Sequence, residues 1–399
     1  MSMLTAIKRF SKIISYNCTR CGQTYSADTP QTYATCCCQP LSVAYDLAHT
    51  SKEMICYEDL SMWRYAALLP VLNKENIVSL GEGMTPVLPL RKLGEKYSLS
   101  DIRLKDESFN PTGSFKARGI SVAVSKAKEF DVKRCIIPTA GNAGGALAAY
   151  CARASMECTV VMPRKTPEVF KEECLLYGAE LILVDGLIND CARKVEELKS
   201  GKEYFDISTM KEPYRLEGKK TMGYEIAEKY NYQLPDVIIY PAGGGTGLIG
   251  IWKAFKEMQE MGWIRGPLPR MIAVQAANCS SIEAALKFPH DWKKRFSPKP
   301  SFANGLAVPY PFAMDMILKV LDESGGETCS VSEVEIISAV KEIALEEGMI
   351  VCPEAGAAWM GLRKLIALRK IDASENILVL NTGSGYKYLH NLFNKQDPY

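Results

Sequence analysis

The sequence predicts an α/β protein with two doubly wound domains and a small cysteine-containing N-terminal extension. From about residue 133 onward, short apolar runs alternate with amphipathic stretches, which is the pattern of repeated βα units around a parallel sheet. Glycine-rich loops directly follow three of the apolar runs. Five of the 14 cysteines crowd into residues 18–38, ahead of these units.

The alternating elements fall into two series. The first is expected to contain strands at 134–138, 157–162 and 180–184 and helices at 145–153 and 168–177. The second is expected to contain strands at 237–240, 271–275 and 377–380, a helix at 248–258 and an irregular connection at 288–311. Because 399 residues exceed one ordinary core, several units are expected. We predict an extension at 1–60, a larger domain from 61–115 plus 232–399, and a smaller domain at 116–231.

Composition favours a cytoplasmic protein that acts on small molecules. Lys plus Arg exceed Asp plus Glu by only two, and no run of like charges suggests a nucleic-acid arm or a membrane-surface patch. The apolar runs are strand length, far short of a membrane span. Residues 1–16 carry no signal-peptide cleavage pattern. The nine cysteines outside the cluster are expected to be reduced core residues.

Lys116 is the first candidate for chemistry. It falls in the first turn of a helix expected at 114–125, directly after the turn residues 110–113. The partial positive charge of a helix N-terminus disfavours an ammonium and favours the neutral amine that forms an imine. On this stretch alone, a solvated surface lysine remains the alternative.

Three loops after predicted strands strengthen the case for a ligand site. They are residues 139–145 with Asn142, residues 242–247 with four glycines and Thr246, and residues 381–385 with Thr382. Glycine-rich turns at helix starts expose backbone amides that suit a phosphate. In parallel α/β sheets the ligand crevice lies at the carboxyl ends of the strands, so the loops are expected to converge.

The stretch Asn110-Pro111-Thr112-Gly113-Ser114-Phe115-Lys116 resembles the cofactor-lysine motif of threonine synthases, which belong to the fold type II pyridoxal-5′-phosphate (PLP) enzymes. The order of the later loops is similar as well, over nearly the whole chain. The resemblance implies that Lys116 holds PLP as a Schiff base, that Asn142 hydrogen-bonds the cofactor's phenolic oxygen and that Thr382 contacts its pyridine nitrogen. The cofactor phosphate is then expected at Gly243, Gly244, Gly245, Thr246 and Gly247.

Residues 212–221 resemble the threonine-synthase segment whose arginine helps to hold an anionic group of O-phosphohomoserine. Arg215 is the candidate here, since a guanidinium binds phosphate or carboxylate with two parallel hydrogen bonds. Thr112 and Ser114 are further substrate candidates by the same resemblance. The implied reaction converts O-phospho-L-homoserine and water to L-threonine and phosphate. Because relatives are often dimers, a homodimer is a candidate assembly.

Two departures from the resemblance concern the substrate. Threonine synthases usually have aspartate after the cofactor lysine, whereas this chain has Ala117, as in the serine and threonine dehydratases. Their loop usually continues with Thr or Ser after Asn142, whereas here Ala143 and Gly144 follow. A threonine or serine dehydratase, or another PLP-dependent β- or γ-replacement synthase for an anionic amino acid, therefore remains an alternative.

Other classes of protein explain the sequence less well. Residues 245–250 match the G-x-G-x-x-G pattern of NAD-binding folds, but no Asp or Glu follows the next predicted strand to hold a ribose. A non-catalytic relative would not need Lys116. The three histidines His49, His290 and His390 lie outside all of these motifs, which argues against a histidine-based hydrolase.

The cysteine cluster resembles the zinc-ribbon-like N-terminal segment of many relatives. Cys18 and Cys21 have knuckle spacing, and the second half is the run Cys36-Cys37-Cys38. The non-adjacent pair makes Cys18, Cys21, Cys36 and Cys38 the expected ligands of a structural zinc. A metal-free remnant of the same fold is the alternative.

Overall fold

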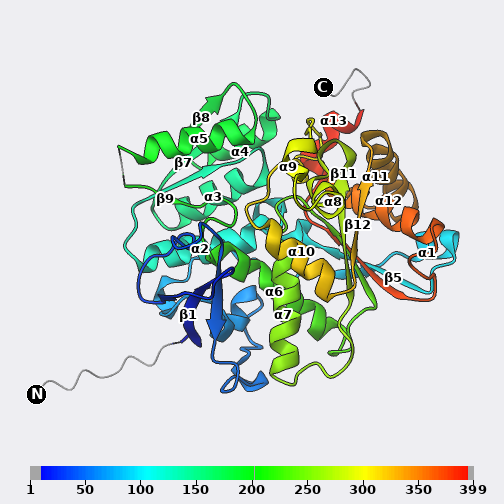
Figure 1. Ribbon diagram of the computed structural model, residues 1–399, viewed down its shortest axis with the longest axis horizontal. Coiled ribbons are helices and arrows are strands. Elements are labelled where there is room, and N and C mark those ends of the chain that lie inside the picture. Colours follow the sequence, from blue (N-terminus) through cyan, green and yellow to red (C-terminus); the bar gives the residue numbers. More distant parts are fainter. Residues whose placement is uncertain (1–9, 202, 394–399) are drawn as a thin grey trace, which may run out of the picture.

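The computed structural model describes residues 10–201 and 203–393, which form three sheets with helices packed around them (Figure 1). Residues 1–9, part of the N-terminal segment 1–16 in which a signal-peptide pattern was sought, lie outside the described residues. A small antiparallel sheet near the N-terminus has the order β2-β1-β3. Its strands are β1 (Ile13–Cys18), β2 (Thr24–Ser26) and β3 (Leu41–Tyr45).

The largest sheet has six strands in the order β12-β11-β10-β13-β5-β4. They are β4 (Val87–Pro89), β5 (Asp101–Asp106), β10 (Val237–Pro241), β11 (Arg270–Ala276), β12 (Glu327–Val331) and β13 (Asn376–Asn381). All neighbours are parallel except the edge pair β4 and β5. Every residue of β10 is buried, as expected for a parallel strand covered on both faces. The carboxyl ends of β10, β13 and β5 consequently lie side by side.

Helices cover both faces of this sheet. α12 contacts the four strands β10, β11, β12 and β13, and α11 packs on α12. α7 and α10 contact β11, and α6 packs along α7. The helices of this part are α1 (Arg91–Tyr97), α6 (Tyr214–Lys229), α7 (Thr246–Glu260), α8 (Ser281–Lys287), α9 (Trp292–Arg295), α10 (Met314–Glu323), α11 (Glu333–Glu347), α12 (Pro353–Ala367) and α13 (Leu389–Phe393).

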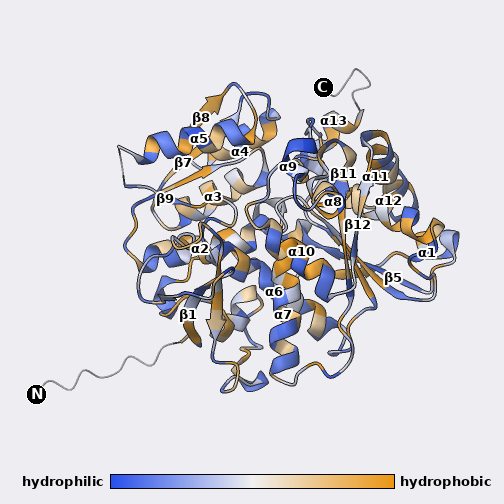
Figure 2. Cartoon of the chain, viewed as in Figure 1, coloured by the Kyte–Doolittle hydropathy of each residue, from blue (hydrophilic) through white to orange (hydrophobic). Residues whose placement is uncertain are grey.

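The third sheet is fully parallel, with the order β8-β7-β6-β9. Its strands are β6 (Arg134–Pro138), β7 (Glu157–Pro163), β8 (Glu180–Val184) and β9 (Phe205–Asp206). The associated helices are α2 (Lys116–Glu129), α3 (Asn142–Arg153), α4 (Glu168–Leu176) and α5 (Ile188–Lys199). Figure 2 shows β7 and β8 mainly orange and α5 largely blue, so the apolar side chains of this lobe concentrate in its sheet.

The expected elements agree closely with the observed ones, but some boundaries differ. α2 runs from Lys116 to Glu129 rather than over 114–125, and α7 extends two residues beyond 248–258 at each end. α3 begins at Asn142 rather than at residue 145. A Cβ on Gly144 would lie 2.8 Å from Cγ2 of Thr139, and one on Gly145 would lie 2.2 Å from the Glu173 carboxylate. These glycines therefore allow close packing of α3 against its neighbours rather than forming a turn. The connection at 288–311 contains the single helical turn α9.

α2 and α6 approach each other at two glycines. A Cβ on Gly218 would lie 2.1 Å from the carbonyl oxygen of Arg118, and one on Gly119 would lie 2.7 Å from that of Arg215. Side chains at either position would push the helices apart, because native packing leaves no such space. This contact places the helix that begins at Lys116 against the helix that carries Arg215.

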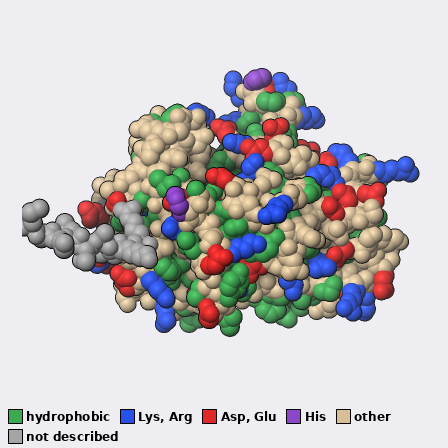
Figure 3. Space-filling view, turned by 90° about the horizontal axis from the view of Figure 1, so that it is seen from below, with side chains coloured by type: hydrophobic (Ala, Val, Ile, Leu, Met, Phe, Trp, Pro, Cys, Tyr) green, Lys and Arg blue, Asp and Glu red, His purple; other side chains and the backbone are tan. Residues whose placement is uncertain are grey.

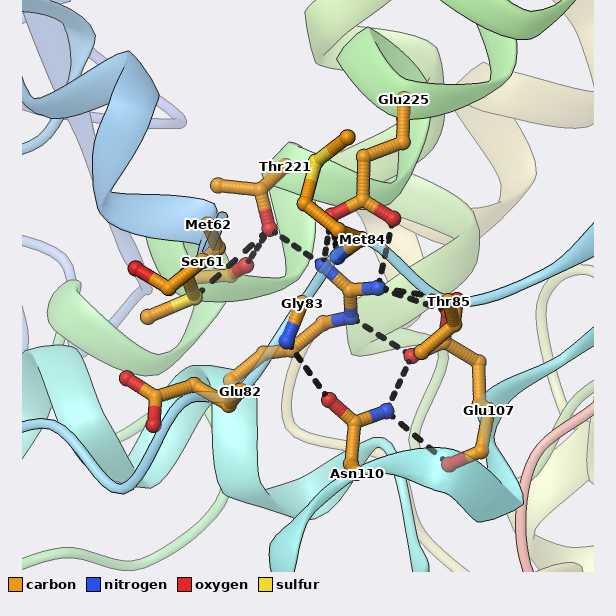
Figure 4. Close-up of polar contacts among 12 residues, drawn as sticks. Ser61, Met62, Glu82, Gly83, Met84, Thr85, Glu107, Asn110, Thr221 and Glu225 are labelled. Carbon is orange, nitrogen blue, oxygen red and sulfur yellow. Dashed lines mark hydrogen bonds and ion pairs between the residues drawn. The ribbon is translucent and has the colours of Figure 1, made fainter. Parts of the chain in front are cut away.

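A buried network of charges lies behind this helix pair (Figure 4). Arg118 donates two hydrogen bonds to Glu107, at 2.6 and 2.8 Å, and one at 2.8 Å to Oε2 of Glu225. Lys105 donates to the same Glu225 oxygen at 2.8 Å. Burial alone would raise the pKa of Glu225, but the charges of Arg118 and Lys105 outweigh it and lower that pKa to about 2. The network is a neutral set of two cations and two carboxylates.

The surface in Figure 3 carries Lys and Arg side chains interspersed with Asp and Glu. Neither sign forms a continuous patch on that face, which fits the near-neutral composition. Among the described residues, no helix is long and apolar enough to cross a membrane.

Candidate cofactor and active site

The carboxyl ends of the two parallel sheets face one cavity of about 250 Å³. The loops after β10 and β13 and the start of α2, which follows β5, supply one wall. The loop after β6 and the start of α6, which follows β9, supply the other. Of the residues expected from the sequence, the cavity is lined by Lys116, Asn142, Arg215, Gly243, Gly244, Gly245, Thr246, Gly247 and Thr382.

Lys116 is the first residue of α2, and its half-buried side chain lines the cavity. Burial and the nearby charge of Arg215 lower the pKa of Lys116 from 10.5 to about 8, although Glu354 acts in the opposite direction. A larger fraction of the amine is then neutral near physiological pH than for an exposed lysine, although the ammonium form still predominates. A neutral primary amine is the nucleophile that condenses with an aldehyde.

Backbone hydrogen bonds hold Lys116 beside the loop that follows β13. The N–H of Phe115 donates to the carbonyl of Thr382 at 3.1 Å, and the N–H of Ser384 donates to that of Gly113 at 2.8 Å. Ser114 also forms an isolated bridge with Gly383. Thr382 therefore lines the cavity at a fixed place relative to Lys116, with its hydroxyl 3.6 Å from the Cys352 thiol.

The loop after β10 fits a phosphate. Within residues 10–201 and 203–393, the amides of Gly243, Gly244, Gly245 and Thr246 donate to no protein acceptor. Gly245 has a φ of 71°, and a Cβ on Gly243 would lie 2.1 Å from the carbonyl oxygen of Gly305, so both positions require glycine. The bare amides lie at the N-terminus of the 15-residue helix α7, where the helix dipole favours an anion.

Asn142 is held in a defined orientation. Lys387 donates to Oδ1 of Asn142 at 3.1 Å, and Nδ2 of Asn142 donates to the Tyr388 hydroxyl at 3.5 Å, which leaves the second N–H of that amide as a donor. The same ammonium pairs with Glu173 at 2.8 Å and donates to the carbonyl of Thr112 at 2.8 Å. Lys387 thereby orients the donor expected at the cofactor's phenolic oxygen.

The family model described as "Pyridoxal-phosphate dependent enzyme" matches residues 78–383, the greater part of the chain and all of the cavity loops. The chain belongs to this family of PLP-dependent enzymes. The threonine synthase of Methanocaldococcus jannaschii is 34% identical over 377 residues, 93% of this chain and 92% of the relative. The threonine synthase of Methanosarcina acetivorans is 33% identical over 369 residues, 92% and 90% of the two chains. The protein is thus a threonine synthase-like PLP enzyme.

Solved structures confirm the fold of this PLP enzyme. An O-ureido-L-serine synthase superimposes with a TM-score of 0.65 at 22% identity, covering 79% of this chain and 94% of that one. The processed form of threonine deaminase isoform 2 from Solanum lycopersicum gives 0.64 at 22% identity, covering 83% and 92%. The predicted fold class and the predicted dependence on PLP are both confirmed.

Of the three residues expected to bind substrate, only Arg215 lines the cavity. Arg215 lines the cavity of the PLP enzyme, whereas Thr112 and Ser114 are not among its lining residues. Ser114 is fully buried, and its hydroxyl accepts a 3.4 Å hydrogen bond from the Lys116 N–H. Thr112 has a φ of 58°, and its hydroxyl is buried without a partner in the described chain. Both residues shape the lysine loop here.

The two departures from the threonine-synthase pattern differ in their consequences. Ala117 is fully buried and does not line the cavity, so a carboxylate there would not reach a ligand without repacking. Ala143 does line the cavity, where it offers no hydroxyl. Gly144 has no room for a side chain. Only position 143 therefore changes the donors available to a substrate.

Sequence reasoning missed three polar residues of the PLP site: Lys219, Glu354 and Tyr388. Glu354 is buried and accepts hydrogen bonds from the Gly305 N–H at 2.8 Å and from the Tyr388 hydroxyl at 3.3 Å. Lys219 follows Arg215 by four residues on α6. That spacing, which places two side chains on one helix face, is the signal that could have revealed it.

The cysteine cluster forms a second candidate site at the end of β1. The Sγ atoms of Cys18, Cys21, Cys36 and Cys37 all lie within 4.8 Å of one another, a four-thiol set that suits a tetrahedral metal such as zinc. Cys38, expected as the fourth ligand, is exposed and lies outside this group. Its φ of 50° and the pairing of Ala34 with Gln39 reverse the chain there, so that Cys37 joins the cluster instead.

Proposed function

We propose that this PLP enzyme is a threonine synthase, a carbon–oxygen lyase that converts O-phospho-L-homoserine and water to L-threonine and phosphate. The observation that carries the proposal is the position of Arg215, a buried guanidinium in the same cavity as Lys116. Similarity to threonine synthases over nearly the full length of both chains supports it.

In this proposal each residue of the cavity has a defined task. When bound, PLP supplies stabilisation of negative charge on the substrate carbon skeleton. The amides of residues 243–247 would hold its phosphate, Asn142 would donate to its phenolic oxygen, and Thr382 would contact its ring nitrogen. A hydroxyl at that nitrogen, in place of a carboxylate, leaves the ring largely unprotonated, which suits elimination and replacement better than transamination.

Lys116 is the base and acid of the proposed reaction. Its amine removes the proton from the α-carbon and carries protons to and from the β-carbon. The bond between the γ-carbon and the phosphate oxygen breaks, phosphate leaves with the bonding electrons, and the γ-carbon gains a proton to become a methyl group. Water then adds its oxygen at the β-carbon, Lys116 returns a proton to the α-carbon, and the second proton of water neutralises one charge of the departed phosphate. The pKa of Lys116 near 8 suits both directions of proton transfer.

Ala143 favours a second candidate, a dehydratase or a replacement synthase that acts on another anionic amino acid. At that position the cavity wall lacks the hydroxyl usual in threonine synthases, so one donor for the substrate is absent. The same Lys116 chemistry would serve such a reaction.

One pair of assays distinguishes these candidates. The purified holoenzyme is incubated with O-phosphohomoserine or with threonine, and threonine plus phosphate are measured in the first case and 2-oxobutyrate in the second. The threonine synthase produces threonine and phosphate in equal amounts, and Lys116→Ala abolishes both. Failure to form threonine from O-phosphohomoserine would reject the proposal, and 2-oxobutyrate from threonine would establish the dehydratase.

A further inference from the structure

A second lysine enters the cavity beside the cofactor lysine. Lys219 lies one turn after Arg215 on α6, and the two side chains are only 1% and 2% exposed. The Lys219 ammonium lies 3.9 Å from the centroid of the Phe115 ring, and that of Lys116 lies 4.4 Å from the same centroid. Lys211 also lines the cavity but pairs with Glu196 at 2.9 Å, so four basic residues gather around this small space and Lys211 alone of them has a close carboxylate partner among the described residues.

Lys219 has few polar partners within the protein. Its ammonium donates one hydrogen bond, at 3.3 Å, to the Phe115 carbonyl, and an ammonium has three donors. Across the described ranges 10–201 and 203–393, no carboxylate lies within ion-pair distance of it. Burial, followed by the charges of Lys116 and Arg215, lowers the pKa of Lys219 well below its usual value. Lys219 therefore has no carboxylate partner of its own in the described chain, although Glu354 lines another part of the cavity.

Arg215 is incompletely paired as well. Its Nη1 donates to the Ile207 carbonyl at 2.8 Å and to the Thr209 hydroxyl at 3.2 Å, but its buried Nε has no hydrogen-bond acceptor in the part of the chain described. The nearest carboxylate, of Glu212, is 4.0 Å from Nε. Burial raises the pKa of Glu212 to about 8, so this carboxyl group neutralises little of the arginine charge at neutral pH.

The adjacent Lys220 shows how a buried lysine is neutralised elsewhere on α6. Lys220 is also fully buried, yet it pairs with Glu217 at 2.8 Å and with Glu257 at 3.0 Å. An unpaired buried cation is costly, whereas a paired one is tolerated. The contrast between adjacent lysines on one helix indicates that the counter-charge of Lys219 comes from a ligand.

We infer that Lys219 is a specificity-determining residue that, together with Arg215, binds the phosphate group of a phosphorylated amino-acid substrate. The inference deepens the proposed function and rests on it. A phosphate monoester carries close to two negative charges at neutral pH and matches one guanidinium fork plus one ammonium. The cofactor phosphate has its own donors in the bare amides of residues 243–246. The two-cation subsite selects a dianion over a single carboxylate.

The test uses inorganic phosphate as the probe, titrated into the holoenzyme by calorimetry without turnover. Lys219→Met removes the charge and keeps the length of the side chain. We expect at least tenfold weaker phosphate binding, about 1.4 kcal/mol, with an unchanged dissociation constant for PLP. The thermal midpoint should stay the same or rise, since a buried amine without a carboxylate partner is replaced by an apolar side chain. Lys219→Arg should retain phosphate binding within a few-fold.

Lys256→Met is the matched control, because Lys256 is exposed on the neighbouring helix α7. It should leave phosphate binding unchanged. Unchanged phosphate affinity in Lys219→Met would overturn the inference, and so would weaker PLP binding with unaltered phosphate binding, which would assign Lys219 to the cofactor. If Lys219→Met does not fold, Lys219→Gln takes its place. Because no turnover is needed, failure to make threonine would reject the proposed function and leave this test intact.

Discussion

Replacing Arg118 with methionine should destabilise the protein by about 3–5 kcal/mol. The guanidinium is fully buried and bonds to Glu107 and Glu225, themselves at most 3% exposed at the side chain. Without it, two buried carboxylates share only Lys105, so one negative charge is left uncompensated. Methionine fills much of the volume of the arginine side chain, so the loss of stability reflects the missing charge more than altered packing.

Urea unfolding of the holoprotein, followed by far-ultraviolet circular dichroism, measures this loss. Arg164→Met is the control, because Arg164 pairs with Asp185 at 2.7 Å on the surface, with side chains 56% and 80% exposed. Such a pair contributes about 0–1 kcal/mol. A cost for Arg118→Met no larger than for Arg164→Met would refute the reasoning.

The pH dependence separates charge from packing. In the native protein the pKa of Glu225 is about 2, below the ordinary 4.5. Its contribution is therefore present in full above pH 4.5 and is lost as the pH falls toward 2. In Arg118→Met that pKa rises and the carboxylates can be neutralised by protonation. The difference in unfolding free energy between variant and parent should consequently shrink as the pH falls. A difference that stays constant with pH would indicate a packing effect alone.

Three further outcomes are expected. The rate of imine formation between the apoprotein and PLP should rise with pH and level off above about pH 8, the pKa of Lys116, and a rise continuing to the usual pKa of 10.5 would contradict the buried amine. Gly218→Ala should lower the unfolding free energy by about 1–3 kcal/mol, whereas Gly266→Ala, in open space, should not, and equal values would argue against the α2–α6 contact. Zinc measured by mass spectrometry should be lost in Cys37→Ser but kept in Cys38→Ser, and a metal-free parent would reject the zinc site.

The apolar strands could be predicted because their sequences carry the signal locally. β10 is an uninterrupted apolar run, and all of its residues are buried. β5 lies in the same sheet but is rich in charges, since Lys105 and Asp106 are buried through polar partners rather than apolar packing. Hydrophobic patterning therefore did not reveal it. The half-exposed edge strand β12 escaped prediction for a similar reason.

The cofactor part of the site was predictable because strand-end loops converge by a general rule of parallel sheets. Lys219 was missed, because α6 is buried on nearly all sides and its periodicity alone does not show which face meets the cavity; only the four-residue spacing from Arg215 could have indicated it. Lys219 and Lys220 are equivalent in the sequence, and only tertiary contacts give one of them carboxylate partners. The choice between Cys37 and Cys38 likewise depends on the conformation of one turn.

The Lys387 ammonium joins groups from both lobes of the enzyme. It bonds to the Thr112 carbonyl ahead of the cofactor helix, and to Glu173 and Asn142 on helices of the smaller sheet. Separation of the lobes would break the contacts to Glu173 and Asn142 together. The next residue, Tyr388, accepts a hydrogen bond from Nδ2 of Asn142 at 3.5 Å. Two consecutive residues after β13 therefore fix the orientation of the Asn142 amide at the cavity.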